Sequence, residues 1–431
     1  MTQTVDLLIE NAARVLLPTF GSSEHGNRTG EDRRPSSQND QKGANGVFGS
    51  EGLSVAILGD KIKAVGPASE IAGRFHALKT LDASGRLLTP GFVDSHTHLV
   101  FAGDRSGEFE MRCRGADYEE IAASGGGIRA SVRATRAASE DELYAESLPR
   151  LERMIAGGTT TVEIKSGYGL DLETELRMLR VARRLGETTP ARVVTTFMGA
   201  HDFPDGFREN RDAYVNLIIE TMIPAVAKEG LAEFCDVFCE RGVFTPEQTR
   251  RVLEAGKAAG LRPKVHADEM APSGGSEVAA EVGAVSADHL MKTTDASIAK
   301  LREAGVVATL LPGTTFFLGK ECFAPARKML DAGLTVALAT DRNPGSCTVE
   351  SMSFIVGLAC LRMGMSPLEG FAAATVGGAA ALGLTGVTGQ IAEGFAADLI
   401  LWETSHEGRI CYEFENHLAR TVIAGGNIIE G

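Results

Sequence analysis

Apolar residues in the middle of the chain gather into short runs that have the length and composition of buried strands. Eight such runs, rich in Val, Ile, Thr and Phe, lie between residues 88 and 345. They are LTPGFVDSHTH (88–98), TTTVEIKSGYG (159–169), ARVVTTFMGAH (191–201), FCDVFCERGVF (234–244), RPKVHADE (262–269), AVSADHL (284–290), VVATLLPG (306–313) and TVALATDRNPG (335–345). We therefore expect eight strands.

Segments of helical periodicity separate these runs. They include residues 141–158, 171–187 and 245–260. The last of them begins with Thr245 before a proline and ends in glycine, as helix start and stop signals predict. Strand and helix alternating eight times predicts an α/β fold, a TIM-like (β/α)8 barrel, over residues 86–385.

The two ends of the chain share a different pattern. Short β-rich runs punctuated by Gly or Asn occupy residues 5–17 and 54–66, and again 397–403 and 421–431. We expect residues 1–85 and 386–431 to form one composite β-sandwich module. Within it, the polar segment 21–46 is rich in Gly, Ser and Asn and is expected to form an exposed, mobile loop without a catalytic role.

Composition narrows the partners. The formal charge of −14 argues against nucleic acid and anionic membrane surfaces, but one arginine can still make a pocket attractive to a small anion. Seven cysteines without a Cys-x-x-Cys pair fit a reduced protein, and the N-terminal residues lack signal-peptide regions. No apolar run is long enough to span a bilayer. We expect a cytoplasmic protein that acts on a small molecule.

Five of the nine histidines lie at predicted strand ends, where a barrel gathers its chemistry. They are His96, His98, His201, His266 and His289, and the eighth strand ends in Asp341. Because strand side chains alternate with period two, His96 and His98 point to the same side. With His266 and Asp341 they make a mixed nitrogen and oxygen ligand set that suits one zinc or iron ion.

Such an ion activates water, so hydrolysis is the expected chemistry. Asp341 is the candidate proton acceptor and donor, and His289 the group that polarises a carbonyl oxygen or carries a proton. The chain has neither a Gly-x-Ser-x-Gly elbow nor a Walker loop. The glycine-rich stretch 124–130 is either a substrate-side loop or a plain flexible connector, and we favour the connector.

These motifs, in this order and spacing, resemble the amidohydrolase superfamily: GFVDSHTH, HADE, SADHL and TDRNPGS. The longer blocks around EIKSGYGLDLETELRMLRV, GAHDFP and DVFCERGVF resemble, more narrowly, the imidazolonepropionase family. That resemblance covers nearly the whole chain apart from residues 21–46. It implies hydrolysis of 4-imidazolone-5-propanoate to N-formimino-L-glutamate in histidine degradation, one zinc or iron ion on the four ligands above, and a homodimer.

The resemblance also implies substrate contacts. Arg105 is expected to meet the propanoate carboxylate, which a guanidinium can bind through two hydrogen bonds. Glu269, three residues past His266, is expected to reach the substrate ring or the water. The remaining implied contacts are Tyr118, Tyr168, His201, His289, Asn343, Gly345 and Ser346. Position alone is equally compatible with a salt bridge for Arg105, core packing for Tyr168 and a structural turn at 343–346.

Two positions depart from or extend the family pattern. Arg342 stands where an aromatic residue is usual; alternating with Asp341, it is expected to point away from the site. Glu240, at the end of the fourth strand, leaves a second metal conceivable, although the family pattern argues for one.

Two other functions compete with ring opening. Deamination of an aminated purine or pyrimidine would keep the site but change the reaction, and a non-catalytic barrel serving in assembly would lose its ligands. Arg105 and the KSGYG motif argue against the first, and the intact ligand set argues against the second.

Overall fold

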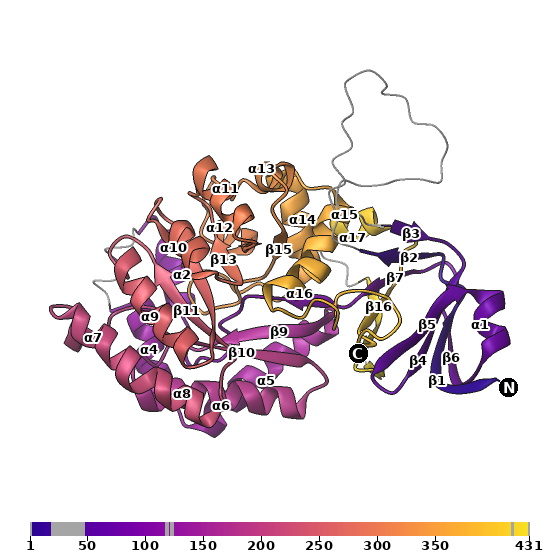
Figure 1. Cartoon of the computed structure of the whole chain (residues 1–431), viewed down its shortest axis with the longest axis horizontal. Coiled ribbons are helices and arrows are strands. Elements are labelled where there is room, and N and C mark those ends of the chain that lie inside the picture. The colour runs from indigo at the N-terminus through magenta and orange to yellow at the C-terminus, as the bar shows by residue number, and fades with distance from the viewer. Residues whose placement is uncertain (1, 19–47, 117–119, 121–124, 415–417, 430–431) are drawn as a thin grey trace, which may run out of the picture.

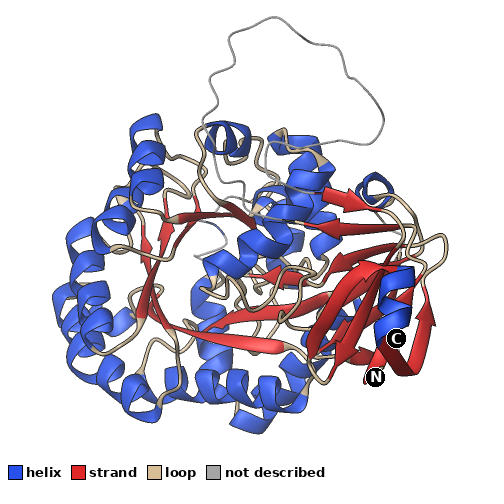
Figure 2. Ribbon diagram, turned by 45° about the vertical axis from the view of Figure 1, so that its right-hand side comes forward, coloured by secondary structure: helices blue, strands red, loops and turns tan. Residues whose placement is uncertain are grey.

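A computed structural model describes residues 2–18, 48–116, 120, 125–414 and 418–429 of the chain. The segment 21–46, expected to form an exposed loop, lies outside the described residues. At the centre is an eight-stranded sheet in which neighbouring strands run parallel in chain order (Figures 1 and 2). Its strands are β8 (Phe92–Asp94), β9 (Thr159–Lys165), β10 (Arg192–Ala200), β11 (Phe234–Cys239), β12 (Arg262–Ala267), β13 (Ser286–His289), β14 (Val307–Leu310) and β15 (Val336–Leu338). The expected (β/α)8 barrel is confirmed.

The first and last barrel strands meet just beyond their regular segments. Thr97 and Arg342 form an isolated parallel bridge. The amide of Asp341 donates to the carbonyl of His96 at 3.0 Å, and the amide of His98 donates to the carbonyl of Arg342 at 2.9 Å. This seam places the His96–His98 pair beside Asp341.

Helices cover the outside of the barrel (Figure 2). The segment starting at Thr245 forms α9, with the capping box that its sequence predicts: Thr245 accepts from the Gln248 amide while Gln248 accepts from the Thr245 amide. The α-helices are α1 (Ala68–Arg74), α2 (Ser106–Cys113), α4 (Ile128–Ala137), α5 (Glu140–Ala156), α6 (Leu172–Thr188), α7 (Arg211–Leu217), α8 (Ile223–Glu229), α9 (Pro246–Ala258), α10 (Gly275–Val282), α11 (Asp295–Glu303), α12 (Pro312–Phe317), α13 (Ala326–Asp331), α14 (Met352–Met363), α15 (Pro367–Ala372), α16 (Gly378–Ala381) and α17 (Glu407–Tyr412). A 3-10 turn forms η1 (Asp205–Phe207), and π-helical turns form η2 (Ile218–Met222) and η3 (Ala373–Gly377).

Strands from both chain ends build two further sheets beside the barrel, at the right of Figure 1. One has the order β5-β4-β1-β6 and the other β18-β17-β16-β7-β2-β3. Apolar side chains from both sheets, such as Ile57 and Leu401, form one shared core. The strands are β1 (Gln3–Glu10), β2 (Arg14–Leu17), β3 (Phe48–Ser50), β4 (Leu53–Leu58), β5 (Lys61–Pro67), β6 (Phe75–Asp82), β7 (Leu87–Pro90), β16 (Leu399–Trp402), β17 (Ala419–Ala424) and β18 (Asn427–Ile429).

The run 88–98 is divided between these two parts of the molecule. Strand β7 pairs with β2 and β16 in the terminal sheet, and β8 pairs with β9 in the barrel. Gly91 joins the two where the chain passes Thr160; a Cβ on this glycine would lie 2.2 Å from the Thr160 hydroxyl oxygen. The boundaries at residues 85 and 385 remain a proposal; β7 lies beyond the first of them, within the range predicted for the barrel, but pairs in the terminal sheet. In the described part of the chain, no helix is both long and apolar enough to cross a membrane.

Candidate active site

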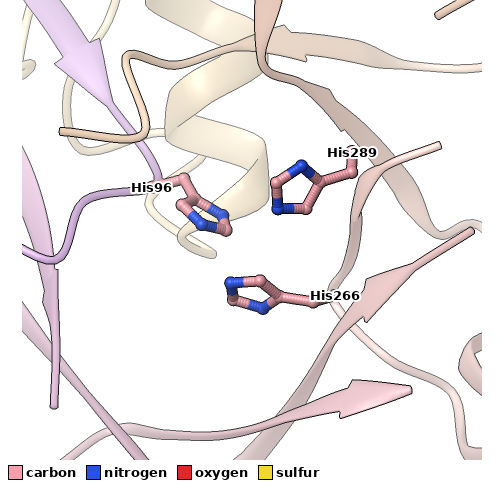
Figure 3. Close-up of side chains that lie close together, drawn as sticks. All are labelled: His96, His266 and His289. Carbon is pink, nitrogen blue, oxygen red and sulfur yellow. The ribbon is translucent and has the colours of Figure 1, made fainter. Parts of the chain in front are cut away.

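The candidate site is a cluster of buried imidazoles at the C-terminal ends of the barrel strands. His96 and His98 follow β8, His266 lies in β12 and His289 ends β13. The rings of His96, His266 and His289 converge (Figure 3), with centroids 4.4 Å apart for His96 and His266 and 5.2 Å for His266 and His289. The seam between β8 and β15 adds the Asp341 carboxylate, so the structure brings all five predicted side chains together.

Their ligand atoms form two overlapping groups in which all atoms lie within 4.8 Å of one another, His96 with His98 and Asp341, and His96 with His266 and His289. His98 Nε2 is 3.3 Å from His266 Nε2, His96 Nε2 is 3.5 Å from Asp341 Oδ1, and His98 Nε2 is 4.0 Å from the same oxygen. A tetrahedral site with bonds of about 2.0 Å separates its ligand atoms by about 3.3 Å. His289 is a further candidate, because one of its nitrogens lies within 4.8 Å of those of His96 and His266.

Two carboxylates that the sequence analysis missed fix the orientation of two imidazoles. Asp288 Oδ2 accepts from His96 Nδ1 at 2.6 Å, and Asp236 Oδ1 accepts from His266 Nδ1 at 3.1 Å. With the proton on Nδ1, each Nε2 offers a lone pair, and His96 Nε2 is buried without a hydrogen-bond partner. The signal for these residues was an acidic residue on an otherwise apolar strand, in FCDVFC and SADHL.

Three of the imidazoles, those of the predicted ligands His96, His98 and His266, are neutral in this setting. Burial lowers the pKa of His96, His98 and His266 well below the usual histidine value, and nearby positive charges lower it further. Neutral imidazole is the metal-binding form. Buried lone pairs that face one another and a carboxylate fit a bound cation, so the residues present fit the metal that the ligand set predicts.

Asp341 combines strained backbone with a partly satisfied carboxylate. Its backbone φ is +54°, a value that residues other than glycine rarely adopt. The Thr314 hydroxyl donates to Oδ2, so Oδ1 is the oxygen that faces the histidines. Burial raises the pKa of Asp341 to about 6, although His289 and the Thr314 hydrogen bond oppose the shift. This value suits a group that takes up and releases a proton near neutral pH.

Unusual backbone is concentrated at this end of the barrel. Five of the six described non-glycine residues with positive φ follow or end barrel strands: Leu170, Asp268, His289, Leu290 and Asp341. Positions of this kind persist only where the surrounding structure fixes them, and they gather at functional sites. The left-handed turn directs the His289 side chain from the strand end into the cluster.

Glu269 lies at the edge of the cluster rather than within the ligand set. Its Oε2 is 3.8 Å from His289 Nε2, and its Oε1 is 3.9 Å from Lys320 Nζ. Its side chain keeps 14% of its surface exposed, so it faces the open side of the site. This position agrees with the predicted contact to substrate or water.

Tyr168 and His201 form a wall beside His98. The His201 ring stacks on His98 with centroids 4.9 Å apart and an interplanar angle of 17°, and Tyr168 lies 5.8 Å from His98. His201 Nδ1 lies 3.0 Å from the carbonyl oxygen of Gly167 and so carries the proton. Burial raises the pKa of Tyr168 well above its usual value, so the phenol keeps its proton and can donate.

Arg105 is held by a glutamate that the sequence analysis also missed. Its Nε and Nη2 donate to Glu108 at 3.0 and 2.7 Å, and Glu108 also accepts the Gly127 amide at 2.9 Å. The remaining Nη1 lies against Gly345, where a Cβ would come within 2.0 Å of it. Arg112 donates to the Gly345 carbonyl at 3.1 Å. Among the described side chains, two guanidinium groups thus share this corner with the Glu108 carboxylate.

The turn at 343–346 is built around Asn343. Its Oδ1 accepts from the amides of Gly345 and Ser346 at 2.9 and 2.8 Å, and its Nδ2 donates to the Asp341 carbonyl at 2.7 Å. These amides are therefore engaged within the turn. The roles of Asn343, Gly345 and Ser346 in substrate binding stay a prediction, and the geometry gives each of them a structural role beside Arg105 and Asp341.

Three other positions from the sequence analysis take distinct places. Tyr118 lies outside the described residues. Arg342 pairs with Glu350 at 2.9 Å and lies over the Phe101 ring, away from the imidazoles as expected. The Glu240 carboxylate accepts the amides of Arg241 and Met270 at 2.8 and 2.9 Å, which leaves it outside the candidate metal groups of the described residues.

Comparison with known proteins agrees with this geometry. Residues 87–429 match the model of the amidohydrolase family. The chain is 51% identical to an imidazolonepropionase of Geobacillus kaustophilus (strain HTA426) over 383 residues, covering 88% of this chain and 90% of the relative. It is 45% identical to an imidazolonepropionase of Myxococcus xanthus (strain DK1622) over 428 residues, covering 98% and 97%. Among solved structures, a zinc-bound adenosine deaminase from Xanthomonas campestris superposes with a TM-score of 0.69 at 19% identity, covering 99% and 93%, which is a likeness of fold.

Proposed function

The chain belongs to the imidazolonepropionase family of amidohydrolases, and from this premise we propose how its residues open the ring of 4-imidazolone-5-propanoate. The reaction is hydrolysis of a cyclic amide, which yields N-formimino-L-glutamate. Water adds its oxygen to the ring carbonyl carbon, the carbon–nitrogen bond breaks, and a proton ends on the departing nitrogen. The single observation that carries the proposal is the convergence of His96, His98, His266 and Asp341 at one end of the barrel.

We propose one zinc or iron ion on those four residues. Three imidazole nitrogens and one carboxylate oxygen are a ligand set that both metals accept. When bound, such an ion lowers the pKa of a water and polarises the carbonyl. The nearby carboxylates of Asp236 and Glu163 are already paired with the ammonium groups of Lys165 and Lys264. Because these carboxylates are engaged, they favour a single ion over a second metal site.

Asp341 moves the proton. Its carboxylate, with Oδ1 toward the histidines and Oδ2 beside the Thr314 hydroxyl, accepts a proton from the attacking water and returns it to the ring nitrogen that leaves. His289 stands beside His96 and His266, where it stabilises the negative charge that develops on the carbonyl oxygen. Glu269, 3.8 Å from His289, orients the substrate ring at the open side.

Arg105 and Tyr168 position the substrate. The Arg105 edge that Glu108 leaves free binds the propanoate carboxylate, and Tyr168 closes the wall beside His98. Binding the carboxylate end of the substrate holds its ring carbonyl close to the reacting water, and this positioning lowers the entropic cost of the reaction. Asn343, Gly345 and Ser346 shape the turn on which Arg105 rests.

The assembly and compartment are proposed on separate grounds. The homodimer is proposed from the family resemblance, and Leu361 and Tyr412, which expose 66% and 82% of their surface on the neighbouring helices α14 and α17, are candidate contacts between the two copies. The seven cysteines are free, which agrees with a cytoplasmic protein. Light scattering of the purified protein tests the first point.

The test is an assay that follows loss of the imidazolone absorbance, with metal analysis of the same sample. We expect close to one zinc or iron per chain, and Asp341→Asn and His266→Ala to reduce turnover to background. Aminated purines and pyrimidines in the same panel should release no ammonia. A preparation that opens the ring equally fast after its metal is removed and excluded would contradict the proposal.

A further inference from the structure

A layer of buried charged side chains lies beneath the histidine cluster, on strands β9, β11, β12 and β13. It consists of Glu163, Lys165, Asp236, Lys264 and Asp288, all with no exposed surface. Ionised groups in the interior are costly unless they are paired with one another. Each charged group of this layer therefore needs a partner of opposite charge or a hydrogen bond. The two lysines have different sets of partners.

Lys165 lies between the two carboxylates that hold imidazoles. Its Nζ is 2.7 Å from Asp236 Oδ2 and 3.6 Å from Asp288 Oδ2. Asp236 uses its second oxygen, Oδ1, to accept from His266 Nδ1. Asp288 accepts from His96 Nδ1 through Oδ2, the oxygen that also faces Lys165. One ammonium thus joins two carboxylate–imidazole pairs that come from different strands.

Lys264 offers a matched comparison. It is equally buried and, like Lys165, lies 2.9 Å from an oxygen of Glu163. Its second bond goes to the Ser95 carbonyl at 3.1 Å rather than to the carboxylates that face the histidines. The two lysines therefore share charge, burial and the Glu163 contact, and differ in their link to the imidazoles.

We infer that Lys165 is a positioning residue for the proposed metal site: its ammonium holds Asp236 and Asp288 so that both keep His266 and His96 as Nδ1–H tautomers. Each Nε2 then presents its lone pair to the cluster. Without this ammonium, the two carboxylates lose their common partner and are free to rotate, which weakens their hold on the imidazoles. This inference rests on the proposed function.

The test compares two double variants, Lys165→Met with Glu163→Gln and Lys264→Met with Glu163→Gln. Each removes one positive and one negative charge, so the net charge of the layer is unchanged and only the position of the remaining ammonium differs. The zinc affinity of each metal-free protein is measured by competition with a chromophoric chelator, and thermal unfolding of the metal-free forms reports the fold. The natural protein is measured alongside.

We expect the Lys165 double variant to bind zinc about 10- to 100-fold more weakly than the natural protein, as loss of outer-sphere support typically does. The Lys264 double variant should stay within about threefold, since the hydrogen bonds to His96 and His266 are intact. Equal losses in both variants would overturn the inference. A natural protein that binds no zinc would instead defeat the proposed function.

A second measurement needs no variant and covers the case in which the double variants do not fold. Nitrogen-15 NMR of the histidine rings in the natural, metal-free protein distinguishes Nδ1–H from Nε2–H tautomers. The inference requires the Nδ1–H tautomer at both His96 and His266. An Nε2–H tautomer at either ring would overturn it.

Discussion

Arg105 supplies positive charge for the substrate carboxylate, but its guanidinium is shared with Glu108. The sequence identifies the arginine through its motif, whereas the glutamate three residues later was unremarkable until the structure showed two hydrogen bonds between them. Residue chemistry alone therefore indicates which groups are available. The neighbours of each group determine what it is free to bind.

Replacing Arg105 by alanine should act on substrate binding. A hydrogen bond to a charged group contributes about 1.5–3 kcal/mol, so kcat/KM for the carboxylate substrate should fall about 10- to 100-fold, mainly through KM. An imidazolone that lacks the carboxylate should lose little. The exposed Arg114, which pairs with Glu110, provides the control variant Arg114→Ala. An equal loss on both substrates would refute the role of Arg105.

The proton-transfer role of Asp341 predicts a pH dependence. A general base must be ionised, so kcat/KM should rise with pH and level off above an inflection no higher than about 6, the raised value that burial gives this carboxyl. A bound cation moves this inflection downward, because positive charge favours the ionised form. A profile that instead rises toward acid would show that Asp341 does not act as the base.

Thr314 gives that prediction a sharper form. Its hydroxyl donates to Asp341 and lowers the pKa of that carboxyl, so Thr314→Val should move the inflection to higher pH. The neighbouring Thr315 is equally buried, and its hydroxyl contacts the Met291 sulfur. Thr315→Val is therefore the control, and an identical profile in the two variants would speak against the Thr314 contact.

At the scale of elements, the sequence correctly predicted the strands and the helix start that depend on neighbouring residues in the chain. The eight apolar runs became barrel strands, and the Thr245 signal became the start of α9. The division of the run 88–98 into β7 and β8 was not foreseen. Between the two strands the chain passes close to Thr160, where a residue larger than Gly91 would clash. The position of this distant side chain cannot be read from the run itself.

The capping box of α9 predicts a stability effect confined to that helix. Thr245→Ala removes the side-chain oxygen that accepts from the Gln248 amide and should lower the free energy of unfolding by about 1 kcal/mol. Thr245→Ser retains the oxygen and should be close to neutral. Urea unfolding measures both, and kcat should be unchanged in both because α9 lies outside the barrel. An undiminished stability for Thr245→Ala would argue against the cap.

At the scale of the whole molecule, the terminal sheet and the barrel share a core. Trp402 of β16 packs against Phe92 of β8 and Phe371 of α15, with ring centroids 5.8 and 6.1 Å apart. Its indole donates to Thr89 at 2.9 Å. Because the contact is apolar and buried, the two parts should unfold together.

Trp402 is the single tryptophan of the chain, which makes this expectation measurable. Its fluorescence during urea unfolding should follow the same curve as far-UV circular dichroism, which reports mainly the barrel helices. Phe371→Ala should shift both curves together by about 3–5 kcal/mol. A fluorescence transition that precedes the loss of helix would show that the terminal module separates first.

The sequence by itself determined the strands, the limits of the helices α5, α6 and α9, the class of fold and the side chains with metal-binding chemistry, because apolar periodicity and strand-end position are local properties. The tertiary structure alone decided which groups meet. His96 is joined to Asp288 across 192 residues, and the seam between β8 and β15 brings the paired histidines to Asp341. Such contacts depend on the register and closure of the barrel, which arise from the packing of all eight strands together.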